Sequence, residues 1–211
     1  MIDLVLVVHI VCGVVALAAA GVALGAAKGG GLHRVFGRIY VLGMLGVTLT
    51  TLALVAVRPN TFLLAVGVFS FYLVFSGWRA GVVRDGRPRW PDHAAGAIMA
   101  GTAALMLAGG VAGVIAGAGS QPVILLVFGA IGLVLVVADW ADWRRGPVTG
   151  KARIARHLSR MLAGSIATLT AAAVVNLTFL PALVVWLGPT VLLTPVIFWW
   201  TARVTGDRMR G

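Results

Sequence analysis

The sequence predicts an all-α polytopic membrane protein, a bundle of seven transmembrane helices in a single domain, residues 1–211. Of the 211 residues, 60% are hydrophobic and only 11% are charged, whereas about a quarter of an ordinary soluble domain is charged. Apolar stretches of about 20 residues, the length that crosses a bilayer as a helix, recur along the whole chain. Such continuous runs lack the alternation of a transmembrane β-barrel, so each stretch is expected to be helical.

The expected spans follow one another with short polar breaks. The first begins with MID, has no basic segment before it and is too long for a signal peptide, so we expect it to stay attached. The second begins within LHRVFGRIY, the fourth follows RWPDH, the fifth ends in ADWADWRR, and the seventh contains two prolines that each remove a backbone donor. The seven expected spans are residues 3–26, 35–57, 61–83, 93–117, 121–141, 155–178 and 181–204.

The basic residues predict the orientation of the bundle. If the N-terminus lies outside, every one of the 17 Lys and Arg residues except Arg58 falls on the cytoplasmic side, which is the positive-inside pattern. We therefore expect a multi-pass protein of the cytoplasmic (inner) membrane with its C-terminus inside. The net charge of +11 then serves contact with anionic lipid headgroups and not with nucleic acid, for which no reading module is visible.

The tryptophans suggest an interfacial belt in the lipid bilayer. Six of the seven lie near the predicted cytoplasmic helix ends, and Trp186 lies nearer the other face. These six are Trp78, Trp90, Trp140, Trp143, Trp199 and Trp200.

Three histidines occupy similar places in the expected topology. His33, His93 and His157 are 60 and 64 residues apart, and each lies at the cytoplasmic start of a helix that runs outward. This spacing corresponds to one helical hairpin per interval and indicates a weak repeat of three hairpins after the first helix. The helix dipole favours neutral imidazole there, the form that ligates metal or haem iron. Alternatively, the histidines hydrogen-bond loops or headgroups.

Other ionisable residues need partners or caps. Asp139 lies at the end of the fifth span, where the helix dipole disfavours an anion. Its candidate partners are Arg144, Arg145, Arg156 and Arg160. Asp92, after Pro91, is expected to be the N-cap of the fourth span.

Two further residues lie inside the first span. His9 lies at membrane depth and is a functional candidate whose role stays open, with Asn176 and Thr178 as possible hydrogen-bond partners. The single cysteine, Cys12, is expected to be a small buried residue.

The stretch LHRVFGRIY resembles the His-Arg-x-x-Gly-Arg-x-Tyr signature of a predicted membrane-protein family called domain of unknown function 2306. RHLSRMLAGSIATLTAAAVVN, residues 156–176, resembles a segment of bacterial members. The resemblance spans most of the chain and implies a multi-pass membrane protein without naming a reaction. After His93 the family often has Arg-Trp-Met-Arg, where this chain has Ala-Ala-Gly-Ala. The family positions carried over are His33, Arg34, Gly37, Arg38 and Tyr40, together with His157 and Met161.

The first functional hypothesis is a cofactor site at the cytoplasmic face. Haem b would be held by two imidazoles, with Arg34, Arg38 or Arg160 at the propionates. A divalent metal ion would instead be bound by His33, His93 and His157, with Asp139 as a possible fourth, oxygen ligand.

Two hypotheses of other classes stay open. One is a transporter or binder of a small anionic solute or lipid, with Arg34 and Arg38 four residues apart on one helix face as the anion contact. The other is a non-catalytic partner subunit or homo-oligomer that associates through Gly109, Gly113 and Gly117, glycines at four-residue spacing.

Overall fold

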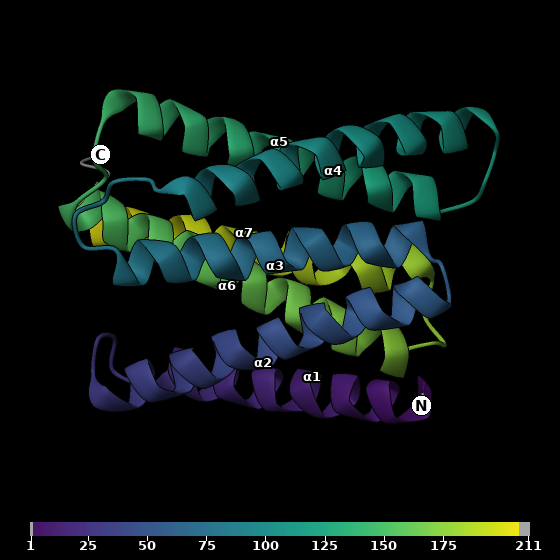
Figure 1. Ribbon diagram of the computed structural model, residues 1–211, viewed down its shortest axis with the longest axis horizontal. Coiled ribbons are helices and arrows are strands. Elements are labelled where there is room, and N and C mark those ends of the chain that lie inside the picture. The colour runs from purple at the N-terminus through teal and green to yellow at the C-terminus, as the bar shows by residue number, and fades with distance from the viewer. Residues whose placement is uncertain (1, 207–211) are drawn as a thin grey trace. The chain divides into compact units, whose positions relative to one another are not determined.

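The chain folds into α-helices throughout the part that the structure, a computed structural model, describes, which is residues 2–206 (Figure 1). This range contains seven helices and no strand, as the composition predicted. The helices are α1 (Ile2–Gly25), α2 (Gly31–Val57), α3 (Thr61–Val82), α4 (Trp90–Ile115), α5 (Gln121–Arg145), α6 (Gly150–Asn176) and α7 (Ala182–Thr205).

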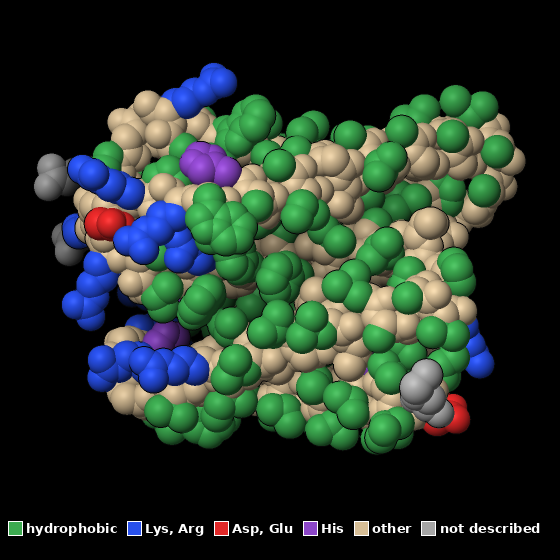
Figure 2. All heavy atoms as spheres, viewed as in Figure 1, with side chains coloured by type: hydrophobic (Ala, Val, Ile, Leu, Met, Phe, Trp, Pro, Cys, Tyr) green, Lys and Arg blue, Asp and Glu red, His purple; other side chains and the backbone are tan. Residues whose placement is uncertain are grey.

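The helices have the dimensions of membrane spans. Each of those in residues 2–206 has between 22 and 27 residues and is apolar enough to cross a bilayer. Their flanks carry mostly hydrophobic side chains, shown in green in Figure 2, whereas Lys and Arg lie near helix ends. A helix satisfies its own backbone hydrogen bonds, which a lipid-exposed segment requires. These features support the prediction of a multi-pass membrane protein.

Four helices extend past the apolar stretches that predicted them by three residues or more, and one of these is α4, which begins at Trp90 and not at 93. α2 begins at Gly31 and not at 35, α5 continues to Arg145 and not to 141, and α6 begins at Gly150 and not at 155. The added turns are polar or charged, so hydropathy alone places them outside a span although their backbone is helical. The positively charged loop between α5 and α6 is therefore much shorter than expected.

The described chain divides into two compact units, one up to Phe71 and one from Tyr72 onward. In the first unit α1 packs against α2 through small residues. A Cβ atom on Gly46 would lie 2.6 Å from the Cys12 sulfur, so the two helices approach closely because that position is glycine. Cys12 is half-buried in this contact.

In the second unit α4 packs against α5, and α6 packs against α7 (Figure 1). The glycines of α4 face α5: a Cβ atom on Gly113 would lie 2.5 Å from Pro122 Cγ, and one on Gly110 would lie 2.7 Å from Leu126. Gly117 occupies the turn after α4 with a φ of +66°. Of the predicted stripe, Gly113 packs tightly within the chain, a Cβ atom on Gly109 would lie 4.0 Å from Leu125, and nothing lies within 4 Å of the Cβ position of Gly117. Association with a partner through Gly109, Gly113 and Gly117 stays a prediction.

Candidate functional site

Three arginines share one face of α6, near the start of the helix. Arg153, Arg156 and Arg160 are spaced i, i+3 and i+7, so their side chains leave the helix on the same side. That side meets α3 and α5. α6 can approach α3 because Gly77 lies at the contact, where a Cβ atom would come within 3.0 Å of Arg160 Cβ.

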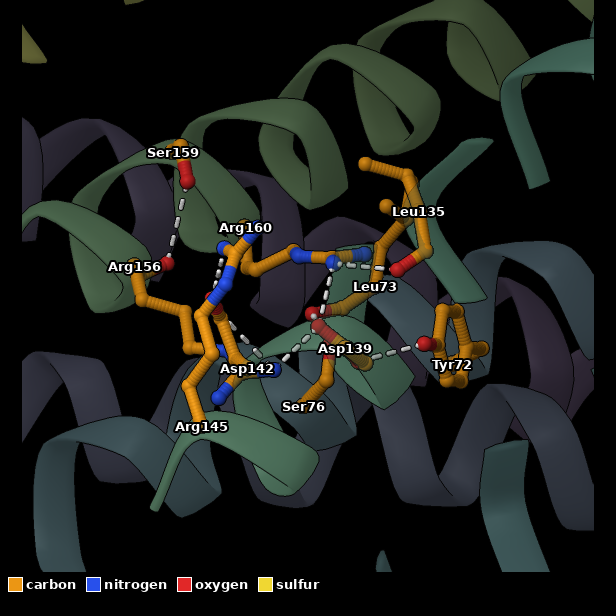
Figure 3. A network of polar contacts seen from close by, with 10 residues as sticks. All are labelled: Tyr72, Leu73, Ser76, Leu135, Asp139, Asp142, Arg145, Arg156, Ser159 and Arg160. Carbon is orange, nitrogen blue, oxygen red and sulfur yellow. Dashed lines mark hydrogen bonds and ion pairs between the residues drawn. The ribbon is translucent and has the colours of Figure 1, made fainter. Parts of the chain in front are cut away.

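Asp139 of α5 lies at the centre of a buried polar network (Figure 3). Its Oδ1 accepts hydrogen bonds from Arg160 Nη2, at 2.6 Å, and from Arg156. The other oxygen, Oδ2, accepts one from the Tyr72 hydroxyl at 2.5 Å. The predicted ion pair is confirmed with these two arginines. Arg145, another predicted candidate, pairs with Asp142 instead and is largely exposed.

Arg160 has more donors than it uses. Besides Asp139, its Nη2 donates to the Leu135 carbonyl at 2.9 Å, and its guanidinium lies 5.5 Å from the centre of the Tyr72 ring. Its Nη1 is buried and has no hydrogen-bond partner among the described residues. A buried unsatisfied donor on a cation is costly. The arginines around Asp139 therefore offer more hydrogen-bond donors than the described acceptors use.

A second ion pair joins the end of α3 to the start of α4. Arg79 donates two hydrogen bonds to Asp92, from Nε at 2.8 Å and from Nη2 at 2.7 Å, which is the bidentate geometry of a strong pair. Asp92 also accepts the backbone N–H of Arg89, the residue at the N-cap. The prediction that Asp92 is itself the N-cap was wrong by one turn, because Pro91 is accommodated inside the first turn of the helix.

Arg153 connects α6 to the end of α3 without forming an ion pair. Its Nη1 donates to the carbonyls of Ala80 and Gly81, at 2.8 and 2.9 Å, which are among the last carbonyls of α3. A cation is favourable at a helix C-terminus. Among residues 2–206 no carboxylate lies within ion-pair distance of Arg153 or of Arg87.

Two loops meet over these side chains. The Val148 N–H donates to the Gly86 carbonyl at 3.1 Å, which links the α3–α4 loop to the α5–α6 loop. Gly86 has a φ of +64°, and a Cβ atom there would lie 2.1 Å from the Val148 carbonyl oxygen, so only glycine fits. Next to it, the backbone N–H of Arg87 donates to Asp85 and lowers the pKa of that exposed carboxyl.

The helix ends and loops of the second unit surround a cavity of about 50 Å³ that is lined by both charged and apolar side chains. Its floor includes Tyr72 and Ser76 of α3 and Asp139 of α5, and Trp143 forms part of its wall. The charged side chains of the lining are Arg79, Arg87, Arg153, Arg156, Asp92 and Asp139. Four arginines face two aspartates, so the lining has an excess of positive charge.

The three predicted histidines bond to the backbone or pack on a ring. Nδ1 of His33 lies 2.9 Å from the Ala23 carbonyl, and Nδ1 of His157 lies 2.8 Å from the Gly77 carbonyl. Because a carbonyl only accepts, both Nδ1 atoms donate, and Nε2 is the acceptor in the neutral ring. The His93 ring packs edge-on against Trp143, with ring centres 4.6 Å apart.

The histidines also differ in helix position. His33 is the third residue of α2 and His93 the fourth of α4, whereas His157 is the eighth of α6, about one turn further in. Within the described residues no group of three or more His, Cys or Asp side chains is placed to hold a metal ion. Both oxygens of Asp139 already accept hydrogen bonds. Haem and metal binding by His33, His93 and His157 remain predictions.

The remaining predicted residues lie in the first unit. Arg34 and Arg38 are exposed, as expected for two residues on one face of α2, whereas Tyr40 is buried. His9 pairs with Thr50 of α2, with 2.9 Å between Nδ1 and the hydroxyl oxygen. Asn176, one of its predicted candidate partners, donates to the Ala172 carbonyl of its own helix.

Tyr72, Arg79 and Arg153 were not predicted as residues of a shared site. A periodic signal was present: Tyr72, Ser76 and Arg79 follow the i, i+4, i+7 pattern of one face of α3. Together with the arginine face of α6, this gives two polar stripes in otherwise apolar helices.

The chain was compared with known protein families, curated proteins and solved structures, and none of the three comparisons finds a match.

Proposed function

We propose that this protein is a multi-pass protein of the cytoplasmic membrane that binds a small anionic group, a phosphate or a carboxylate, in the cavity between α3, α4, α5 and α6. The observation that carries the proposal is the unbalanced charge of the lining, above all Arg153, which lines the cavity without a carboxylate partner in residues 2–206. An arginine fork suits phosphate and carboxylate oxygens. This is the anion-binding hypothesis, with Arg153 and Arg87 in place of Arg34 and Arg38.

Two features of the cavity support an anion over a metal cation. The two aspartates of the lining are neutralised by Arg79 and by Arg156 with Arg160, so neither carboxylate is free to attract a cation. Two arginines of the lining have donors that make no hydrogen bond. Only Nη1 of Arg153 donates to carbonyls, and no side-chain hydrogen bond of Arg87 is found within residues 2–206. An incoming anion therefore meets charge-assisted donors.

The proposal is tested on the full chain in an uncharged detergent at low ionic strength. Inorganic phosphate, sulfate and citrate are titrated by calorimetry against wild type, Arg153→Gln and the matched control Arg84→Gln. Arg84 is exposed, lies in the same loop region as Arg87 and does not line the cavity. Loss of a charged hydrogen bond of about 1.5–3 kcal/mol weakens binding roughly ten- to a hundredfold in Arg153→Gln. Equal affinities in both variants would contradict the proposal.

We also propose that this cavity lies on the cytoplasmic side, with the N-terminus outside. The charge bias of the loops supports this orientation. The weak repeat of three hairpins and the likeness to the domain of unknown function 2306 family remain proposals as well. In a Cys12→Ser background, Thr149→Cys and Ser120→Cys lie in loops at opposite helix ends. A membrane-impermeant thiol reagent should label the Ser120 position in intact cells and the Thr149 position only after permeabilisation. The reverse pattern would reject this orientation.

A further inference from the structure

We propose that the group held in the cavity is the phosphate monoester of a membrane lipid, with the rest of the lipid outside the cavity. This inference rests on the proposed function and specifies its ligand. The shared chemistry is a phosphate dianion, which a lipid or free inorganic phosphate can supply. The size and charge of the cavity specify the phosphate, and its depth and surroundings favour the lipid.

The size of the cavity limits what can enter it. Its volume of about 50 Å³ corresponds to a few water molecules, since one water needs roughly 10–15 Å³ of such space. One phosphate-sized group fits, and whatever is attached to that phosphate must lie outside the cavity. The ligand is therefore a terminal phosphate whose remaining atoms lie elsewhere.

The charge of the lining matches a phosphate monoester. Four arginines against two aspartates leave an excess of two positive charges, and a phosphate monoester carries about −1.5 to −2 near neutral pH. A phosphodiester carries one negative charge and has a substituent on both sides. The Ser76 hydroxyl, which donates to the Leu73 carbonyl at 3.2 Å, lies in the same lining.

We place the cavity at the depth of lipid phosphates by taking the ends of α3 and α5 as the outer edge of the headgroup layer. Arg79 lies three residues before the end of α3 and Asp139 six before the end of α5, which is about 5 and 9 Å along the helix at 1.5 Å per residue. The headgroup layer of one leaflet is roughly 5–7 Å thick. The mouth of the cavity is therefore level with the headgroups and its floor is level with the first part of the acyl chains.

The surroundings of the cavity are those of a membrane interface. Trp90 and Trp140, at the start of α4 and near the end of α5, are 80% and 49% exposed, as expected for indole rings among headgroups. The lining also includes apolar side chains such as Phe75, Val83 and Val148. These side chains suit a ligand that has both a phosphate group and acyl chains.

The experiment compares soluble short-chain ligands on the full chain in an uncharged detergent. Calorimetry measures the affinities for dioctanoyl phosphatidate, dioctanoyl phosphatidylglycerol, dioctanoyl phosphatidylcholine and inorganic phosphate. Phosphatidate should bind at least about tenfold more tightly than each of the other three, because it alone combines a dianion with acyl chains.

Two lining variants and one control locate the binding. Arg153→Gln and Arg87→Gln should each weaken phosphatidate binding by about tenfold or more, whereas Arg84→Gln should keep the wild-type affinity. Arg153→Gln loses the contacts of Arg153 with α3, which can harm folding. Arg87→Gln should fold normally, because Arg87 is exposed and no side-chain hydrogen bond is found for it in the described range.

Each contrary outcome has a distinct meaning. If inorganic phosphate binds as tightly as phosphatidate with the same dependence on Arg153 and Arg87, the lipid inference is overturned and the proposed function stands. If phosphatidate binds equally to wild type and both lining variants, it binds elsewhere on the surface, and the lipid inference is again overturned. If none of the anionic ligands binds, both the inference and the proposed function fail.

Discussion

Arg160 of α6 and Asp139 of α5 form a buried ion pair, with 2.6 Å between Nη2 and Oδ1 and side chains that are 6% and 4% exposed. Breaking such a pair leaves a charge without its partner in a medium of low polarity, which costs far more than the pair contributes when intact. Because Arg156 also pairs with Asp139, the network should respond very differently to the loss of one member and to the removal of all three charges.

We expect Arg160→Met to lower the free energy of unfolding by about 1.5–3 kcal/mol, because it removes one charged hydrogen bond from Asp139 while Arg156 still pairs with that carboxylate. Unfolding of the detergent-solubilised protein by a denaturing detergent measures the change. Arg145→Gln serves as the control, since its side chain is 79% exposed and its loss should change stability by no more than about 0.5 kcal/mol. Replacing all three charges, Arg156→Met and Arg160→Met with Asp139→Leu, should recover most of the lost stability, because no member of the network is then left without its partner. A cost for Arg160→Met as small as that of the control would contradict a buried pair.

Tyr72→Phe removes the hydroxyl that donates to Asp139 Oδ2 at 2.5 Å while keeping the ring. We expect a loss of about 1–3 kcal/mol, the cost of leaving a buried acceptor unsatisfied. The same unfolding assay measures it. A double-mutant cycle with Asp139→Asn provides the control, because the effect of Tyr72→Phe should shrink when the carboxylate is absent. Strict additivity of the two substitutions would show that they do not interact.

Gly86→Ala tests the contact between the two loops over the cavity. A Cβ atom at Gly86 would lie 2.1 Å from the Val148 carbonyl oxygen, so the loops must separate. Gly117→Ala is a matched control: its φ of +66° is close to the +64° of Gly86, and nothing lies within 4 Å of its Cβ position. The control should cost about 1–2 kcal/mol from backbone conformation alone. Gly86→Ala should cost clearly more and increase protease cleavage at residues 146–149, and equal costs would exclude the steric contact.

Gly46→Ala tests the approach of α1 to α2 in the first unit. The added methyl group would lie 2.6 Å from the Cys12 sulfur, and overpacking of this kind costs about 1–3 kcal/mol. Cys12→Ala removes the sulfur and should restore part of the lost stability, so that the two substitutions are non-additive in thermal unfolding. If Cys12→Ala gives no rescue, the sulfur is not the atom that limits the approach of the helices.

Features that need a hydrogen-bond or charge partner inside the bilayer were predictable from the sequence. The helices follow from hydrophobicity, because lipid allows the backbone no other hydrogen-bond partners. The partners of Asp139 were predictable because an anion at that depth requires cations, and Arg156 and Arg160 were within reach. Helix ends were less predictable, since the polar turn up to Arg145 is helical without being apolar.

The rest of the site depends on contacts between segments far apart in the chain. A phenol such as Tyr72 tolerates apolar surroundings, so the residues next to it in the sequence do not indicate a hydrogen-bond partner 67 residues away. Gly86 and Val148 meet only because two loops converge, and Arg153 finds its acceptors on a helix more than 70 residues earlier. Asp92 shows the same limit on a smaller scale, because its pairing with Arg79 depends on how α3 and α4 are placed.

The Asp139 network joins two consecutive helices, which affects how the chain inserts into the membrane during synthesis. The carboxylate belongs to α5, whereas both guanidinium partners belong to α6, only a four-residue connection later. A nascent chain that released α5 alone from the translocon would expose an anion to hydrocarbon, at a cost of up to about 3 kcal/mol. Entry of the two helices into the bilayer as one neutralised hairpin avoids that step, so the pairing that stabilises the finished protein also favours the order in which it is made.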